Sequence, residues 1–282
     1  MYTKTIAITG ASGFIGSNLS RHLKIDFNVI EINIRDYKEV RELTNFLEKN
    51  KITHFINCIG GKSVGFSLKN PLFDFESNVS VGVFILHAIS AVKFNIHFSH
   101  ISSAGIYGEQ NELFNEHFIF SPYATHKKIF EFSIQSLLKN NFLIIRPFSV
   151  YGTGLKKQIL FDAYKKFNKE KNVVFYGTGN EIRNFIYIDD LCEIIHKHLL
   201  NNITGIIDIG STEQITIKQL LTHYSEVLRI ENNFSFNGIF DNGNPQNLSI
   251  IKNKLLIEHH SYTSLNDGLK KYSEWIRKFF SN

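Results

Sequence analysis

One short stretch near the start of the chain constrains its fold more than any other. The apolar run 6–8 leads directly into three glycines with the spacing G-x-x-G-x-x-G, at Gly10, Gly13 and Gly16. Apolar residues then recur at helical spacing as far as Leu23. This pattern predicts a strand, a tight turn and a helix, with glycines that let the backbone approach a ligand closely. Because a helix N-terminus attracts negative charge, we expect the turn to bind the pyrophosphate of a dinucleotide cofactor.

Composition and charge narrow the class of protein. Of the 282 residues, 43% are hydrophobic and 20% are charged, which is enough to bury a core. The net charge is +5, but lysines and arginines are scattered, which argues against a nucleic-acid partner. No apolar run approaches the ~20 residues that a membrane helix needs, and no signal peptide precedes the first strand. Cys58 and Cys192 are too few for a disulfide framework and lack metal-ligand spacing. We therefore expect a cytoplasmic protein without a metal or a membrane partner.

The second predicted strand, residues 28–33, bears on the choice of cofactor. Dinucleotide-binding folds commonly end this strand with an acidic residue that binds the ribose 2′-hydroxyl of NAD. Here Asn33 stands at that place, and Arg35 follows it. A missing carboxylate and a nearby guanidinium favour NADP over NAD; the alternative is that Arg35 is merely solvated. Asp36 is expected to cap the next helix, 37–49, or to contact the adenine amino group.

Two later segments are expected to lie beside the cofactor. A third strand, 53–58, continues into glycines, where the backbone must again pass near the ligand. A long helix is predicted over 72–93, and Asn78 within it is interpreted as a buried hydrogen-bonding residue that fixes helix to strand. The fourth strand, 95–101, ends in Ser102 and Ser103. Since the carboxyl ends of parallel strands bind ligands in open α/β sheets, these serines are expected to face the cofactor site.

A tyrosine and a lysine follow the serines at helical spacing. Tyr123 and Lys127 are four residues apart at the start of a predicted helix, so they lie on one helix face. That spacing alone is typical of a solvated pair, but its place after a serine-bearing strand end favours a catalytic pair. A fifth strand, 143–146, then leads to Pro147.

Five motifs of this chain, taken together, resemble those of the extended short-chain dehydrogenase/reductase family, in particular its nucleotide-sugar branch. They run in family order over most of the chain: TGASGFIG at 9–16, SSAGIYG at 102–108, YATHK at 123–127, RPFSVYG at 146–152 and EIRNFIYIDDL at 181–191. The resemblance implies an α/β fold, with a Rossmann-type doubly wound parallel sheet and a smaller, mostly helical C-terminal substrate domain. The dinucleotide-binding domain is predicted to span 1–150, with 184–211 returning to its sheet. The substrate domain would take 151–183 and 212–282.

The resemblance also implies roles for individual residues. Tyr123 would transfer a proton, and the ammonium of Lys127 would lower the pKa of the tyrosine and hold the nicotinamide ribose. Ser103 would hydrogen-bond the same sugar oxygen, with Ser102 as the fallback. Arg183 would bind the substrate diphosphate, or else form an ordinary surface salt bridge. The candidate cofactor-binding residues are Gly10, Ser12, Gly13, Phe14, Ile15, Gly16, Asn33, Arg35, Asp36, Cys58, Ile59, Gly60, Asn78, Tyr123, Lys127 and Pro147.

Several reactions are compatible with these motifs. Related 4,6-dehydratases carry Asp-Glu where this chain has Ala104 and Gly105, which excludes that activity. An NADP-dependent reductase of a nucleoside-diphosphate 4-keto-6-deoxyhexose is favoured. Three features favour the reductase. The chain is short, its second strand lacks the acidic residue, and Asn244 stands where epimerases of this family usually carry the arginine of an Arg-Pro-x-Asp motif. The alternatives are an NAD-dependent 4-epimerase and a catalytically silent NAD(P) sensor, although the intact Tyr–Lys pair disfavours the sensor. Relatives often form homodimers through helices near 72–93 and 123–140.

Overall fold

The computed structural model describes residues 4–61, 63–109, 121–231, 233–239, 243–249 and 260–281. A six-stranded sheet forms its centre, in the order β2-β1-β3-β4-β5-β9, and every pair of neighbours is parallel. Its strands are β1 (Thr5–Thr9), β2 (Asn28–Ile32), β3 (His54–Asn57), β4 (His97–Ile101), β5 (Phe142–Pro147) and β9 (Gly205–Ile209). The order reverses between β1 and β3, which is the switch point where such folds bind ligands.

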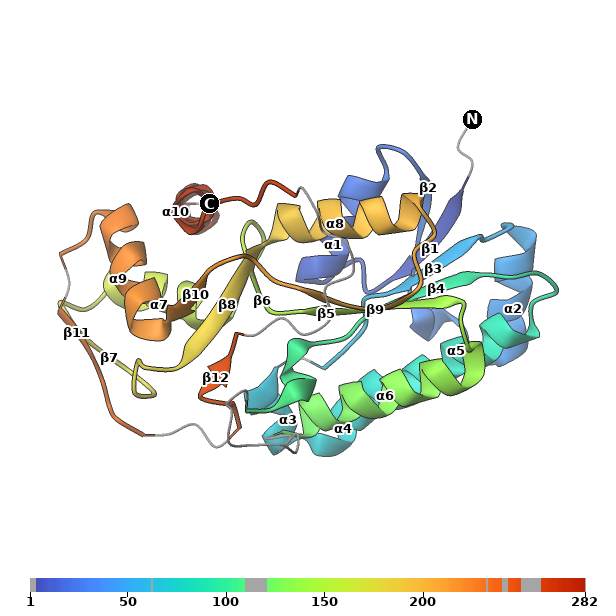
Figure 1. The fold of residues 1–282 in the computed structure, drawn as a ribbon, viewed down its shortest axis with the longest axis horizontal. Helices are drawn as coiled ribbons and strands as arrows, with labels where there is room; N and C mark the ends of the chain where they lie inside the picture. The colour runs from blue at the N-terminus through green and yellow to red at the C-terminus, as the bar shows by residue number, and fades with distance from the viewer. Residues whose placement is uncertain are drawn as a thin grey trace.

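Helices cover both faces of the central sheet (Figure 1). One face carries α1 (Phe14–Leu23) and α8 (Ile188–Leu200), and the other carries α2 (Val40–Lys49), α5 (Val81–Ala91) and α6 (Pro122–Leu138). The alternation within β1 explains this arrangement. Ile6 and Ile8 join the hydrophobic core beneath α1 and α8, whereas Ala7 joins the core beneath α2 and α5. The expected doubly wound α/β sheet is confirmed.

The remaining elements form a second unit beside the carboxyl edge of the sheet (Figure 1). A second sheet has the order β10-β8-β12, with β6 also pairing with β8, and β7 and β11 form a separate parallel pair. These strands are β6 (Ser149–Tyr151), β7 (Asn172–Phe175), β8 (Ile182–Tyr187), β10 (Gln214–Thr216), β11 (Asn233–Phe236) and β12 (Asn247–Leu248). The helices are α7 (Gln158–Phe167), α9 (Ile217–Leu228) and α10 (Leu265–Ser281). The segment 184–211 was expected to return to the central sheet, and its strand β9 pairs there with β5. The division of the chain into two domains stays a prediction.

The segment predicted as one helix over 72–93 is divided. It consists of α4 (Pro71–Phe75), a π-type turn η2 (Glu76–Ser80) and α5, and it follows the short helix α3 (Val64–Lys69). The stretch Pro71–Ala91 is also long and apolar enough, by length and composition, to cross a membrane. In the fold, however, α5 packs against α2 and α6 and buries one face, so we interpret it as a core helix.

Asp36 does not cap the helix that follows it, so the capping expectation is wrong, whereas its contact with the adenine amino group stays a prediction. The residue belongs to a separate 3-10 turn, η1 (Ile34–Asp36), and α2 begins only at Val40. The carboxylate of Glu42 instead accepts the backbone N–H groups of Lys38 and Glu39. A carboxylate in the first helical turn satisfies N–H groups that have no partner within the helix.

Candidate active site

The glycine-rich turn has the geometry of a phosphate cradle. Gly10 has a φ of +72°, and the Gly13 N–H donates to its carbonyl oxygen at 3.0 Å. A Cβ on Gly16 would lie 2.2 Å from that same oxygen, so a side chain there would displace backbone. The turn therefore requires glycine at both places, and it presents the N-terminus of α1 to a ligand. The glycine turn and the N-terminus of α1 therefore fit the pyrophosphate of a dinucleotide.

A large cavity of about 900 Å³ lies between the glycine turn and the second unit. That volume is at the upper end of the range for small-molecule sites. The candidate residues that line it are Gly13, Phe14, Ile15, Gly16, Cys58, Gly60, Ser102, Ser103, Tyr123, Lys127, Pro147 and Arg183. The candidates outside the lining are Gly10, Ser12, Asn33, Arg35, Asp36, Ile59 and Asn78.

The two serines at the end of β4 point in different directions. Ser103 precedes the 3-10 turn η3 (Ala104–Tyr107), where its hydroxyl accepts the Gly105 N–H at 3.0 Å, and it lies close enough to the Tyr123 side chain to act on its pKa. The Ser102 hydroxyl instead donates to buried Glu131 at 2.6 Å. Ser103, rather than Ser102, is therefore the serine that lies beside the tyrosine.

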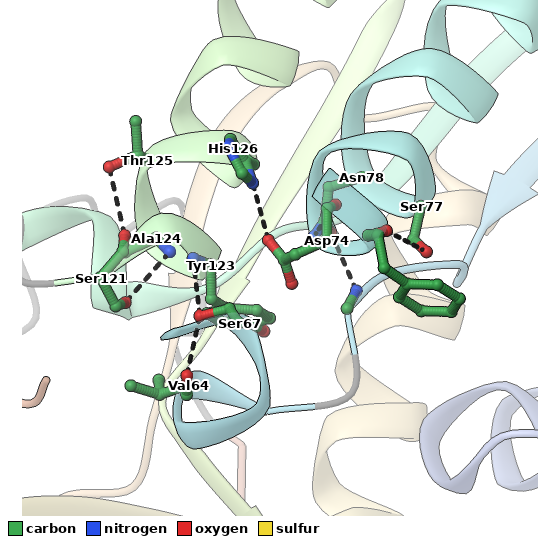
Figure 2. Close-up of polar contacts among 12 residues, drawn as sticks. Val64, Ser67, Asp74, Ser77, Asn78, Ser121, Tyr123, Ala124, Thr125 and His126 are labelled. Atoms are coloured by element: carbon green, nitrogen blue, oxygen red, sulfur yellow. Dashed lines mark hydrogen bonds and ion pairs between the residues drawn. The ribbon is translucent and has the colours of Figure 1, made fainter. Parts of the chain in front are cut away.

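Local hydrogen bonds fix the start of α6, which carries both Tyr123 and Lys127 (Figure 2). Ser121 is the N-cap residue, and its hydroxyl accepts the Ala124 N–H at 3.4 Å. The Tyr123 N–H donates to the Ser67 hydroxyl at 3.1 Å, and that hydroxyl donates to the Val64 carbonyl at 2.7 Å. The first turn of α6 is thus attached to α3 across the site.

Lys127 is almost completely buried, and its environment differs from that of a surface lysine. The side chain is 3% exposed, and Nζ donates to the Ile101 carbonyl at 2.7 Å. Burial lowers the pKa of Lys127 to about 8, because the charged form loses hydration.

The pKa of Tyr123 moves opposite to the expected direction. We expected Lys127 to lower it, but burial raises it, and the nearby Asp74 raises it further. Ser103 acts on this pKa in the lowering direction without reversing the shift. In this state Tyr123 is therefore a phenol that holds its proton, as a general acid does.

Arg183 lines the cavity, but its guanidinium also contacts the chain itself. It donates to the carbonyls of Pro245 at 2.8 Å and Gln246 at 3.2 Å. The carboxylate of Glu109 accepts the N–H groups of Gln246 at 2.5 Å and Asn247 at 2.8 Å. Residues 245–247 are thus held from both sides across the mouth of the cavity.

The end of β2 carries no carboxylate directed toward the glycine turn. Glu31 accepts hydrogen bonds from Ser20 and Lys24, both at 2.6 Å, which lower its pKa. Asn33 accepts the Arg35 N–H at 3.3 Å and donates to Asp36 at 3.0 Å. Arg35 is exposed beside this turn.

Asn78 lies behind the cavity and holds the loop after β3. It is 1% exposed, its Oδ1 accepts the Gly61 N–H at 3.1 Å, and its Nδ2 donates to the Asp74 carbonyl at 3.0 Å. This is the buried fixing role interpreted from its apolar neighbours.

Several lining residues were not anticipated from the sequence. They are Ser63, Val64, Gly65, Lys157, Gln158, Tyr176 and Glu181. The first three lie at the end of the loop that follows β3 and at the start of α3, and the carboxyl end of a strand in a parallel sheet is a position that predicts ligand contact. The others come from the second unit, whose path the sequence pattern does not determine. Among the described residues, no group of three His, Cys, Asp or Glu side chains is placed to hold a metal.

Comparisons with known proteins agree with this architecture. The sequence profile of the NAD dependent epimerase/dehydratase family matches residues 6–210. An uncharacterized UDP-glucose epimerase, YtcB of Bacillus subtilis (strain 168), is 24% identical, and the match covers 98% of each chain. The structure of UDP-glucuronic acid 4-epimerase from Bacillus cereus, in complex with UDP-glucuronic acid and NAD, superposes with a TM-score of 0.83 at 23% identity. That match covers 98% of this chain and 99% of the other.

A second solved structure carries the other nicotinamide cofactor. RMD from Pseudomonas aeruginosa, complexed with NADPH, superposes with a TM-score of 0.80 at 17% identity. The match covers 98% of this chain and 100% of the other. At these identities the two structures establish the shared fold.

Proposed function

Because this chain belongs to the NAD dependent epimerase/dehydratase family, we propose that it is an NAD-dependent nucleotide-sugar 4-epimerase. The observation that carries the proposal is that Ser103, Tyr123 and buried Lys127 line the same cavity as the glycine turn. The full-length likeness to proteins named as epimerases supports this reaction better than the reduction that the sequence favoured.

The residues of the chain would manage the proton of the reaction. When bound, a nicotinamide supplies reversible acceptance of hydride from a sugar carbon. The phenol of Tyr123 would first release its own proton to solvent. The phenolate would then take the C4 hydroxyl proton as that hydroxyl becomes a ketone, and it would return the proton once hydride is delivered to the opposite face of the ketone. Ser103 would hydrogen-bond the same oxygen. Arg183 would meet the diphosphate, for which a forked guanidinium is suited.

The glycine turn would hold the cofactor pyrophosphate through the N–H groups at the start of α1. Lys127 would hold the nicotinamide ribose, since its ammonium lies on the same helix face as Tyr123 and reaches the loop at Gly60. Both assignments need only side chains and amides that line the cavity.

An NADP-dependent 4-ketosugar reductase is the second candidate, and the end of β2 favours it. The exposed Arg35 and the engagement of Glu31 by Ser20 and Lys24 leave a site better suited to a 2′-phosphate than to a free ribose hydroxyl. The fold-level likeness to a protein solved with NADPH is compatible with this reading.

One experiment separates the two candidates. The purified protein is denatured, and the released nucleotide is identified by chromatography. Native protein is offered UDP-glucose and UDP-glucuronic acid, and separately NADPH with a nucleoside-diphosphate 4-keto-6-deoxyhexose. An epimerase would release NAD and form the C4 epimer without net consumption of reduced cofactor. Stoichiometric oxidation of NADPH with the ketosugar would establish the reductase instead, and no conversion of either substrate would favour a silent sensor.

We also propose a cytoplasmic homodimer. Large apolar side chains are exposed on α4, α5 and α6, which lie side by side on one face (Figure 1): Leu72, Val83, Ile129, Phe132 and Leu137. Such a patch is typical of a surface that pairs with a second copy. Light scattering should report twice the 32.5 kDa chain mass, and Phe132→Glu should shift the protein toward monomer. A monomeric parent protein would contradict this proposal.

A further inference from the structure

A buried acid–imidazole pair lies directly behind Tyr123 and Lys127. Asp74 in α4 is completely buried, and its Oδ2 accepts a hydrogen bond from Nδ1 of His126 at 2.8 Å (Figure 2). His126 lies on α6 between the two candidate catalytic residues in sequence. Its side chain is 14% exposed and packs edge-on against Phe75 at 5.3 Å. Neither member lines the cavity, so neither contacts a ligand there.

The second carboxylate oxygen of Asp74 makes the pair unusual. Among the described residues, Oδ1 has no hydrogen-bond partner, although it is buried. A buried carboxylate oxygen without a partner is costly unless an opposite charge lies nearby.

Two adjacent glycines show where that opposite charge is. A Cβ on Gly61 would lie 1.9 Å from Asp74 Oδ1, and a Cβ on Gly60 would lie 2.7 Å from Lys127 Nζ. The Asn78 amide contacts both of these positions, with Oδ1 near Gly60 and Nδ2 near Gly61. The carboxylate and the ammonium therefore face consecutive residues of one loop, with Asn78 between them.

The titratable and charged groups around the site come from several elements. Asp74 faces Tyr123 and Lys127 from α4, Cys58 faces Lys127 from the end of β3, and Glu131 faces Lys127 from the next turn of α6. Burial raises the pKa of the Cys58 thiol to about 12, so this group is neutral. Glu131 forms a buried ion pair with Arg146 at 2.6 Å, which satisfies its charge. Asp74 is thus the acidic group whose charge acts on both Tyr123 and Lys127.

We propose that Asp74 and His126 are a positioning pair. The carboxylate of Asp74, oriented by His126, keeps Tyr123 in its proton-bearing form and Lys127 in its ammonium form. This proposal rests on the proposed function, in that it takes Tyr123 as the proton-transferring group. It adds that the proton affinity of Tyr123 and Lys127 depends on two residues that do not line the cavity. The negative charge of Asp74 favours the protonated form of each group, so it raises the pKa of both Tyr123 and Lys127.

The test measures the ionisation of Tyr123 directly and requires no substrate. Asp74→Asn removes the negative charge with little change in volume. Phenol ionisation is followed by near-ultraviolet absorbance in the full-length protein, with and without Asp74→Asn and with and without Tyr123→Phe. The difference between each pair of proteins isolates Tyr123. Loss of Asp74 should move its ionisation to lower pH by on the order of one unit. An ionisation of Tyr123 that is unmoved in Asp74→Asn overturns the proposal.

A second variant keeps the test decisive if Asp74→Asn folds poorly. His126→Leu removes the hydrogen bond that orients the Asp74 carboxylate, so the carboxylate should act less strongly on Tyr123. Tyr123 ionisation should again move to lower pH, and movement to higher pH would contradict the mechanism. Asp26→Asn is the control, since Asp26, in the connection after α1, forms an acid–imidazole pair at 3.1 Å with His196 of α8. That variant should leave Tyr123 unchanged.

The two proposals fail separately. If Tyr123→Phe retains turnover, the proposed function fails, while the titration still decides whether Asp74 acts on Tyr123. If turnover is lost in Tyr123→Phe but Asp74→Asn leaves the ionisation unmoved, only the positioning pair is wrong.

Discussion

At the scale of single residues, Tyr123 is the group on which the chemistry depends. Burial together with Asp74 raises its pKa, so it holds its proton in the protein without ligands, and Ser103 beside it acts in the opposite direction. Lys127 nearby has a pKa lowered to about 8, so its charge is sensitive to conditions near neutrality. The pair thus has one group that holds a proton and one that can lose it, an arrangement suited to reversible proton transfer.

Replacing the tyrosine should remove that step without emptying the site. Tyr123→Phe deletes only the hydroxyl, so turnover should fall by about 100- to 10,000-fold, while the dissociation constant for NAD(H) should change by less than about threefold. Steady-state assays and fluorescence titration with NADH measure the two quantities. Tyr164→Phe, which changes a phenol in α7 that stacks on Phe280, is the control. Turnover retained in Tyr123→Phe would show that another group transfers the proton.

At the scale of elements, α6 unites the catalytic face with the sheet. Tyr123, Lys127 and Glu131 occur at successive intervals of four residues, so one helix face carries all three. The Glu131 carboxylate accepts from Arg146 Nε at 2.9 Å and Nη2 at 2.6 Å, which joins α6 to β5. Arg146 also donates to the Tyr107 hydroxyl at 2.7 Å, which joins η3 to the same network. This network holds η3, which follows Ser103, at a fixed distance from α6, which carries Tyr123.

Breaking the network should destabilise the protein strongly. Glu131→Gln leaves the buried Arg146 charge without its ionic partner, so the free energy of unfolding should fall by about 3 kcal/mol. Chemical denaturation monitored by circular dichroism measures this change. Replacing both partners, as Glu131→Leu with Arg146→Met, should recover part of the loss, because no buried charge is then left unpaired. A double variant less stable than the single one would mean that the ion pair itself supplies net stability.

The sequence predicted some elements well because their determinants are local. The strand, turn and helix around Gly10, Gly13 and Gly16 follow from glycine spacing and apolar periodicity, and the structure has them at those places. The π-type turn at Glu76–Ser80 was missed, because apolar periodicity continues through it while the turn depends on how Asn78 meets the loop after β3. Which of two serines faces Tyr123 likewise depended on Glu131, a partner 29 residues from Ser102.

At the scale of the whole molecule, the cavity forms where distant segments meet. Glu109 holds Gln246 across 137 residues of sequence, and Arg183 holds Pro245 across 62. No periodicity reports such contacts, so the sequence did not predict that Lys157 and Tyr176 of the second unit line the cavity. The pKa of Tyr123 was misjudged for the same reason, since its direction depends on burial and on Asp74, which the chain brings from α4.

Buried histidines give the whole fold a pH dependence of stability. His54 in β3 and His97 in β4 are 4% and 6% exposed, and their rings lie 5.2 Å apart. Burial, followed by the neighbouring His97 and Lys4, lowers the pKa of His54 to about 4; burial also lowers the pKa of His97. In the unfolded chain a histidine titrates near pH 6.5, so between these values the unfolded state binds more protons than the folded state.

The stability that these neutral imidazoles confer should therefore be complete above about pH 6.5 and decline as the pH falls toward 4. Each such group contributes a slope of at most about 1.4 kcal/mol per pH unit in that window. His54→Gln removes one titrating group, so denaturant unfolding at a series of pH values should give a shallower slope between about pH 6.5 and 4. His223→Gln, whose side chain is 55% exposed on α9, is the matched loss of an imidazole. A slope as steep in His54→Gln as in the parent would mean that acid acts on the fold elsewhere, since the protons taken up on unfolding would then not include this site.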